Sequence, residues 1–81
     1  MPFEELDVVR LKRSVRDIGL YQSESVVVLA GEIGTIINAR NDLDSYEVEF
    51  LKGYPQINPR ILAFSSADLE LVPESEYDDL P

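Results

Sequence analysis

The segment Tyr46-Glu47-Val48-Glu49-Phe50 decides the fold of this chain. Its aromatic and aliphatic side chains alternate strictly with two carboxylates, and a period of two is that of a β-strand. We therefore expect Tyr46, Val48 and Phe50 to face a core and Glu47 and Glu49 to face water. A catalytic carboxylate pair needs a cleft and two unequal environments. We interpret these two carboxylates as a solvated outer face.

The residues before this strand predict a hairpin. Residues 33–38 (Ile-Gly-Thr-Ile-Ile-Asn) are rich in β-branched side chains, and residues 41–44 (Asn-Asp-Leu-Asp) are typical turn formers. Gly34 lies inside the first of these segments. A glycine within a strand predicts a bulge or a sharp bend at the corner of a barrel.

The residues after the hairpin predict two more short strands, at 60–64 and 69–72, separated by a helical turn at 65–68. Residues 53–59 contain two prolines, which exclude a helix or a central strand there. Pro73 ends the last strand. A domain over residues 1–73 and an acidic, frayed tail over 74–81 follow from this division. The expected core comprises Ile33, Ile36, Tyr46, Val48, Phe50, Leu62, Phe64, Leu69 and Leu71.

The first part of the chain fits two structures. Residues 6–12 can form a strand, whereas Val8, Leu11, Val15 and Ile18 are spaced as on one face of a helix, with Gly19 as its cap. The paired β-branched residues Val8 and Val9 favour the strand. Residues 13–30 then form a long loop with an inserted strand at 26–30. If that strand is unpaired, it can add to the sheet of a second copy, which allows a homodimer.

The order of these segments resembles an all-β, small SH3-like barrel of about five strands with a long first loop. More narrowly, the chain is similar to a bacterial family of small SH3-like domains, the family named domain of unknown function 4926. Residues 5–9 (Glu-Leu-Asp-Val-Val), 31–37 (Gly-Glu-Ile-Gly-Thr-Ile-Ile), 46–50 and 69–72 carry the resemblance. Residues 22–29 depart from it, as an insertion into the shorter first loop that is usual in the family. The resemblance implies a fold and transfers no catalytic residue.

Composition excludes several classes of chemistry. The 81 residues contain neither cysteine nor histidine, which removes thiolate metal sites, disulfides and the commonest general base. We therefore expect no catalytic residue, no cofactor and no metal site, and we expect that the protein is not an enzyme. The seven basic and sixteen acidic residues give a net charge of −9. Such a field repels phosphate backbones and disfavours binding to nucleic acid.

Five residues are candidates for binding a partner. Tyr21 and Tyr54 are amphipathic aromatics, and Tyr54 lies beside a proline; such side chains can line a groove for an extended peptide. Arg10, Lys12 and Arg13 form a basic cluster near the start of the chain that can grip an acidic group. The competing interpretations are partial core packing for the tyrosines and internal charge compensation for the basic cluster.

The sequence thus favours a non-enzymatic module that binds another protein, as an adaptor or regulator, through an acidic surface. The alternatives are an immunity or antitoxin protein that neutralises a basic toxin, and an accessory domain of an enzyme subunit. The N-terminus is acidic, and the longest apolar run covers only residues 26–30. Neither a secretory signal nor a membrane span is predicted from these features, so we expect a cytoplasmic protein.

Overall fold

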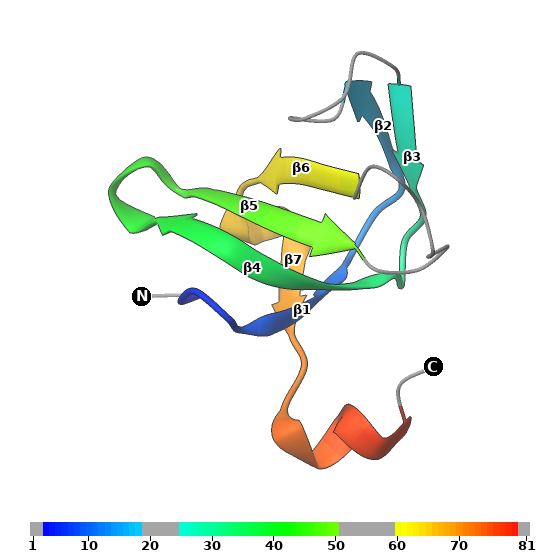
Figure 1. Cartoon of the computed structure of the whole chain (residues 1–81), viewed down its shortest axis with the longest axis vertical. Coiled ribbons are helices and arrows are strands. Elements are labelled where there is room, and N and C mark those ends of the chain that lie inside the picture. The colour runs from blue at the N-terminus through cyan, green and yellow to red at the C-terminus, as the bar shows by residue number, and fades with distance from the viewer. Residues whose placement is uncertain (1–2, 19–24, 51–59, 80–81) are drawn as a thin grey trace.

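The computed structural model describes residues 3–18, 25–50 and 60–79, and all their regular structure is strand or short 3-10 helix (Figure 1). The strands are β1 (Val8–Leu11), β2 (Val15–Ile18), β3 (Ser25–Val28), β4 (Ile33–Arg40), β5 (Ser45–Phe50), β6 (Arg60–Phe64) and β7 (Leu69–Leu71). The 3-10 helices are η1 (Asn41–Leu43), η2 (Ser66–Asp68) and η3 (Glu74–Asp79). The predicted all-β class is confirmed.

Five of the strands form one antiparallel sheet in the order β6-β5-β4-β1-β7, and β2 and β3 form a separate two-stranded ribbon. β6 and β7 lie at opposite edges of the large sheet, yet only residues 65–68 connect them. A link this short keeps the two edges close, so the sheet must curl around its inner face. The arrangement is consistent with a small SH3-like barrel whose long first loop carries the ribbon.

The β4–β5 hairpin forms as the alternation of its residues predicts. Along β5, Tyr46, Val48 and Phe50 are buried and the residues between them are half-buried. The register between β4 and β5 shifts between Ile36 and Asn38, so the bulge lies there and not at Gly34. A Cβ atom on Gly34 would lie 2.6 Å from Val48 Cγ1 and 2.8 Å from the Glu49 carbonyl oxygen. Gly34 therefore permits a close approach of β4 to β5.

Most of the predicted core is buried, and two of its members are wrong. Ile33 pairs with Arg10 on the face opposite Gly34 and Ile36, because neighbouring residues of a strand point to opposite faces. Leu71 is 49% exposed, since it is the last residue of an edge strand and has a neighbouring strand on one side only. Four residues join the core cluster that the sequence did not predict there: Phe3, Val9, Leu11 and Val28.

The ambiguous N-terminal region is not helix, but the prediction of loop at residues 15–18 is wrong, because they form strand β2. Residues 15–18 pair with residues 25–28, with Val15 opposite Val28 and Arg16 opposite Val27. The inserted strand expected at 26–30 is thus β3, but it is paired within the chain, so the premise behind the homodimer was wrong. Val28 is fully buried and Val15 packs against the core, so these two residues attach the ribbon to the barrel.

The acidic tail is more ordered than expected. Residues 74–79 form η3, and the Glu76 amide donates to the Pro73 carbonyl 2.9 Å away. Val72, just before η3, is buried, and its amide donates to the carbonyl of Val8 on β1. The chain beyond β7 therefore stays attached to the first strand.

Candidate binding surface

The β4–β5 hairpin carries an acidic face, which we define as Glu47 and Glu49 on β5 together with Asp42 and Asp44 in the turn. Glu47 and Glu49 alternate with buried residues on β5, so both carboxylates point away from the core. Asn38 lies opposite Glu47, and its amide Nδ2 donates to Glu47 Oε2 at 3.4 Å. β5 is paired on both sides, with β4 and with β6, so the backbone positions of Glu47 and Glu49 are fixed.

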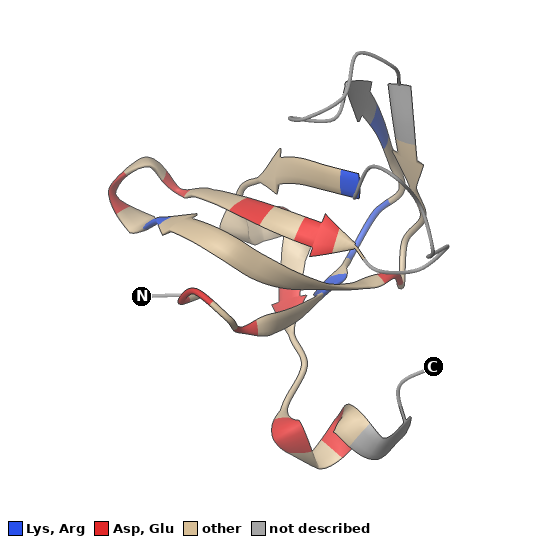
Figure 2. Cartoon of the chain, viewed as in Figure 1, with Lys and Arg blue, Asp and Glu red and all other residues tan. Residues whose placement is uncertain are grey.

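The acidic face continues into the turn of the hairpin, as Figure 2 shows. Asp44 has a left-handed backbone with φ of 49°, a conformation that aspartate tolerates better than most residues. Its Oδ1 accepts a hydrogen bond from the Ser66 amide at 3.0 Å, which ties the turn to η2. Asp42 lies 3.9 Å from the Arg40 guanidinium and is exposed.

Buried aromatic residues fix this hairpin to the N-terminal segment. The rings of Phe3 and Tyr46 meet edge to face, with centroids 5.3 Å apart. The Tyr46 hydroxyl donates to Asn41 Oδ1, and Asn41 Nδ2 donates to the Phe3 carbonyl at 3.2 Å. Burial raises the pKa of the Tyr46 phenol, and the Asp44 carboxylate raises it further.

Two of the predicted basic contact residues are engaged within the chain. Arg10 Nη1 on β1 lies 3.8 Å from Glu70 Oε1 on β7, and Arg10 Nη2 lies 3.3 Å from Glu76 Oε2 on η3. Arg13 donates two hydrogen bonds to the carboxylate of Asp68, at 2.8 and 3.0 Å. These hydrogen bonds lower the pKa of Asp68 and raise that of Arg13. Both arginines thus compensate carboxylates of the same chain. This agrees with the second interpretation of the basic cluster, internal charge compensation.

Of the other three predicted contact residues, the structure describes one, Lys12. Lys12 is exposed, and its backbone amide donates to the Asp68 carbonyl at 2.9 Å. Tyr21 and Tyr54 lie outside the described residues. Their role in binding stays a prediction.

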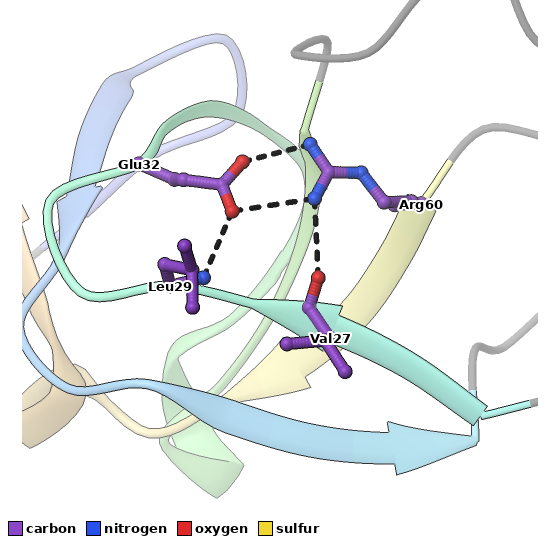
Figure 3. A network of polar contacts seen from close by, with 4 residues as sticks. All are labelled: Val27, Leu29, Glu32 and Arg60. Atoms are coloured by element: carbon purple, nitrogen blue, oxygen red, sulfur yellow. Dashed lines mark hydrogen bonds and ion pairs between the residues drawn. The ribbon is translucent and has the colours of Figure 1, made fainter.

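A buried ion pair that sequence reasoning missed joins the first loop to β6 (Figure 3). Arg60 Nη2 lies 2.8 Å from Glu32 Oε1, and the two side chains are 15% and 7% exposed. Glu32 Oε2 also accepts from the Leu29 amide at 2.8 Å, while Arg60 Nη1 donates to the Val27 carbonyl at 3.2 Å. The partners are 28 residues apart, so no local pattern reveals the pair. One guanidinium thereby holds the end of β3 against the barrel.

These pairs change what the net charge means. Four of the seven basic residues, Arg10, Arg13, Arg40 and Arg60, lie in ion pairs with carboxylates of the same chain. Within the described residues, Glu47 and Glu49 form no ion pair, whereas Asp42 of the acidic face pairs with Arg40. In that same part of the chain, no three Asp or Glu side chains converge as metal ligands would. None of its helices is long and apolar enough to cross a membrane.

Comparison with known proteins adds no name: no family model, no curated protein and no solved structure matches the chain. The resemblance to the family of small bacterial SH3-like domains therefore stays a prediction.

Proposed function

We propose that this chain is a non-enzymatic protein-binding module that uses its acidic face to bind a basic surface of another protein. The observation that carries the proposal is the position of Glu47 and Glu49, side by side along a paired strand and without a basic partner among the described residues. A backbone already held in a sheet loses little conformational freedom on binding, and the field of its carboxylates speeds association with a positive partner.

The charge distribution supports the same function. The internal ion pairs use arginines, so the surplus of negative charge remains on the outside of the barrel. If the captured partner is a basic toxin, the chain is an immunity protein, which is one kind of protein-binding module.

The test is affinity capture with the purified chain coupled to beads, followed by mass spectrometry of the retained proteins. Glu47→Lys is compared with Glu74→Lys, which makes the same charge change at an exposed residue of η3. We expect at least one protein to be retained by the unaltered chain and by Glu74→Lys and to be lost from Glu47→Lys. Its retention should fall when salt rises from about 0.05 to about 0.5 M, because screening weakens exposed charge pairs.

Two results would contradict the proposal. One is that the beads retain nothing beyond what an unrelated acidic protein of equal net charge retains. The other is equal loss with both variants, which would mean that the total charge matters and the acidic face does not.

A further inference from the structure

Leu6 combines two unfavourable features at one residue. Its side chain is 78% exposed, the largest exposed fraction of the large hydrophobic residues in the described part of the chain. Its φ is 74°, in the left-handed region that leucine rarely adopts. The other non-glycine residue with positive φ there is Asp44, whose side chain accepts a hydrogen bond from Ser66. No comparable compensation exists at Leu6.

The conformation of Leu6 is imposed by its turn. The Asp7 amide donates to the Glu4 carbonyl at 3.1 Å, which closes a four-residue turn with Leu6 in third place. Positive φ at this place alone is typical of a type II turn, where glycine or asparagine is usual. Asp7 Oδ2 also accepts from the Glu4 amide at 2.9 Å. Leucine thus occupies a position that suits glycine.

The turn is held firmly against β4. The Leu6 amide donates to the Ile36 carbonyl at 2.8 Å, and the Ile36 amide donates to the Asp7 carbonyl at 3.0 Å. Two residues of one segment therefore oppose one residue of β4, as in a bulge. Ile37, the neighbour of Ile36 at the register shift of β4, is itself 37% exposed. The position of Leu6 is fixed before any partner arrives.

Neither burial nor backbone preference within the chain explains a leucine here. Its apolar surface stays in water, and glycine would relieve the strained φ. Strained residues concentrate at functional sites, where the strain positions a group for contact. A contact that buries the Leu6 side chain and offsets its strained backbone must therefore come from outside the described residues.

The residues around Leu6 indicate the chemistry of that contact. Glu4 and Glu5 precede it and Asp7 follows it, and the first two are exposed. The turn also adjoins β4, whose Asn38 lies opposite Glu47 of the acidic face. We infer that Leu6 is the anchor by which this chain inserts into an apolar pocket of a protein partner, a pocket bordered by lysine or arginine. This inference rests on the proposed function.

The first test measures stability and needs no partner. Leu6→Gly should leave the midpoint of urea denaturation unchanged or raise it, because glycine suits the positive φ and little burial is lost. Leu71→Gly is the matched control, an exposed leucine in a regular strand, and should lower the midpoint. A lower midpoint for Leu6→Gly than for the unaltered chain would show that Leu6 supports the fold, and would overturn the inference.

The second test identifies the contact. The chain has no cysteine, so Leu6→Cys provides a unique thiol for a benzophenone crosslinker, and Leu71→Cys provides the control. We expect illumination in a lysate to join one protein to position 6 and not to position 71. With that partner purified, Leu6→Gly should raise the dissociation constant at least about tenfold, which is about 1.4 kcal/mol of binding free energy. Leu71→Gly should raise it less than about twofold.

The outcomes separate the two proposals. If a purified partner binds Leu6→Gly as tightly as the unaltered chain, the anchor is wrong and the binding module stands. If no protein binds the unaltered chain, both are wrong. If the pocket found at position 6 is lined by acidic residues, the inferred chemistry of the partner is wrong.

Discussion

The five-stranded sheet and the β2–β3 ribbon are held in place by different forces. The sheet encloses a continuous apolar core, with Val48 and Phe50 fully buried at its centre. The ribbon contributes Val28 to that core, and Val15 packs against it, while ion pairs hold the residues around the ribbon. Figure 1 shows it beside the barrel, close to the start of β6, where Arg60 contacts both Val27 and Glu32.

The contrast shows how a short chain places a loop without a second core. The Arg60–Glu32 pair holds the ribbon on the β3 side, and the Arg13–Asp68 pair holds the loop before β2. An ion pair has strict geometry, whereas apolar packing tolerates small displacements. Changes in the core should therefore unfold the whole chain, and changes in the ion pairs should loosen the ribbon first.

The largest effect is expected from Phe50→Ala. Phe50 is fully buried and meets Phe64 edge to face, with ring centroids 5.8 Å apart. Truncation of a buried phenylalanine costs about 3–5 kcal/mol of unfolding free energy. Leu71→Ala, at a half-exposed leucine, should cost about 1 kcal/mol or less. Urea denaturation of both variants checks this, and similar losses would mean that Leu71 belongs to the core after all.

Gly34→Ala should follow, with a loss of about 2–3 kcal/mol from overpacking. The added methyl would meet Val48, the Glu49 carbonyl and Phe50, and a strand backbone cannot move aside easily. Gly31→Ala is the matched change, since nothing lies within 4 Å of that Cβ but its φ is 94°. Thermal denaturation should show the smaller loss at Gly31, and the reverse order would refute the close approach of β4 to β5.

Arg60→Met separates the two regions most directly. The change removes the guanidinium from Glu32 and Val27, and we expect a loss of about 2 kcal/mol. The loss should be local: amide hydrogen exchange should quicken in β2 and β3 and stay slow in β4 and β5. Arg40→Met, at an exposed arginine 3.9 Å from Asp42, is the control and should change neither region. Uniform acceleration across both regions would show that the ribbon and the sheet unfold as one unit.

The smallest effect concerns Asp68 and depends on pH. The hydrogen bonds from Arg13 lower the pKa of Asp68 in the folded state, so near that pKa the unfolded chain binds more protons than the folded one. The stabilisation is complete above about pH 4, the ordinary value for aspartate, and is lost as pH falls through the lowered folded pKa. Asp68→Asn should therefore be less stable than the unaltered chain at neutral pH and closer to it in acid.

Denaturation midpoints of both proteins, measured between neutral pH and about pH 2, test this prediction. High salt at neutral pH should also bring the two midpoints together, because Arg13 is exposed and its pair is screened. A difference that stays constant from neutral pH to acid would mean that the carboxylate charge of Asp68 plays no part.

Local patterns in the sequence determined much of this fold. The alternation at residues 46–50, the turn formers at 41–44 and the β-branched residues at 33–38 predicted an all-β chain with the hairpin at its centre. The prediction from the prolines of residues 53–59 lies outside the described residues. The direction of Glu47 and Glu49, away from the core, followed from the same period, although both residues are half-buried and not fully solvated. These inferences succeeded because each depends on residues that are neighbours along the chain.

Tertiary structure alone decided the rest. The buried ion pair joins Glu32 to Arg60 across 28 residues, and Arg13 meets Asp68 across 55, so neither has a local signal. Whether residues 8–18 became strand or helix depended on the strands that they could pair with, since both periods fit the sequence. The turn that gives Leu6 its positive φ is held against β4 by hydrogen bonds to Ile36, which is distant along the chain. Closing the sheet brings these distant groups together, and a pattern among neighbouring residues does not reveal such contacts.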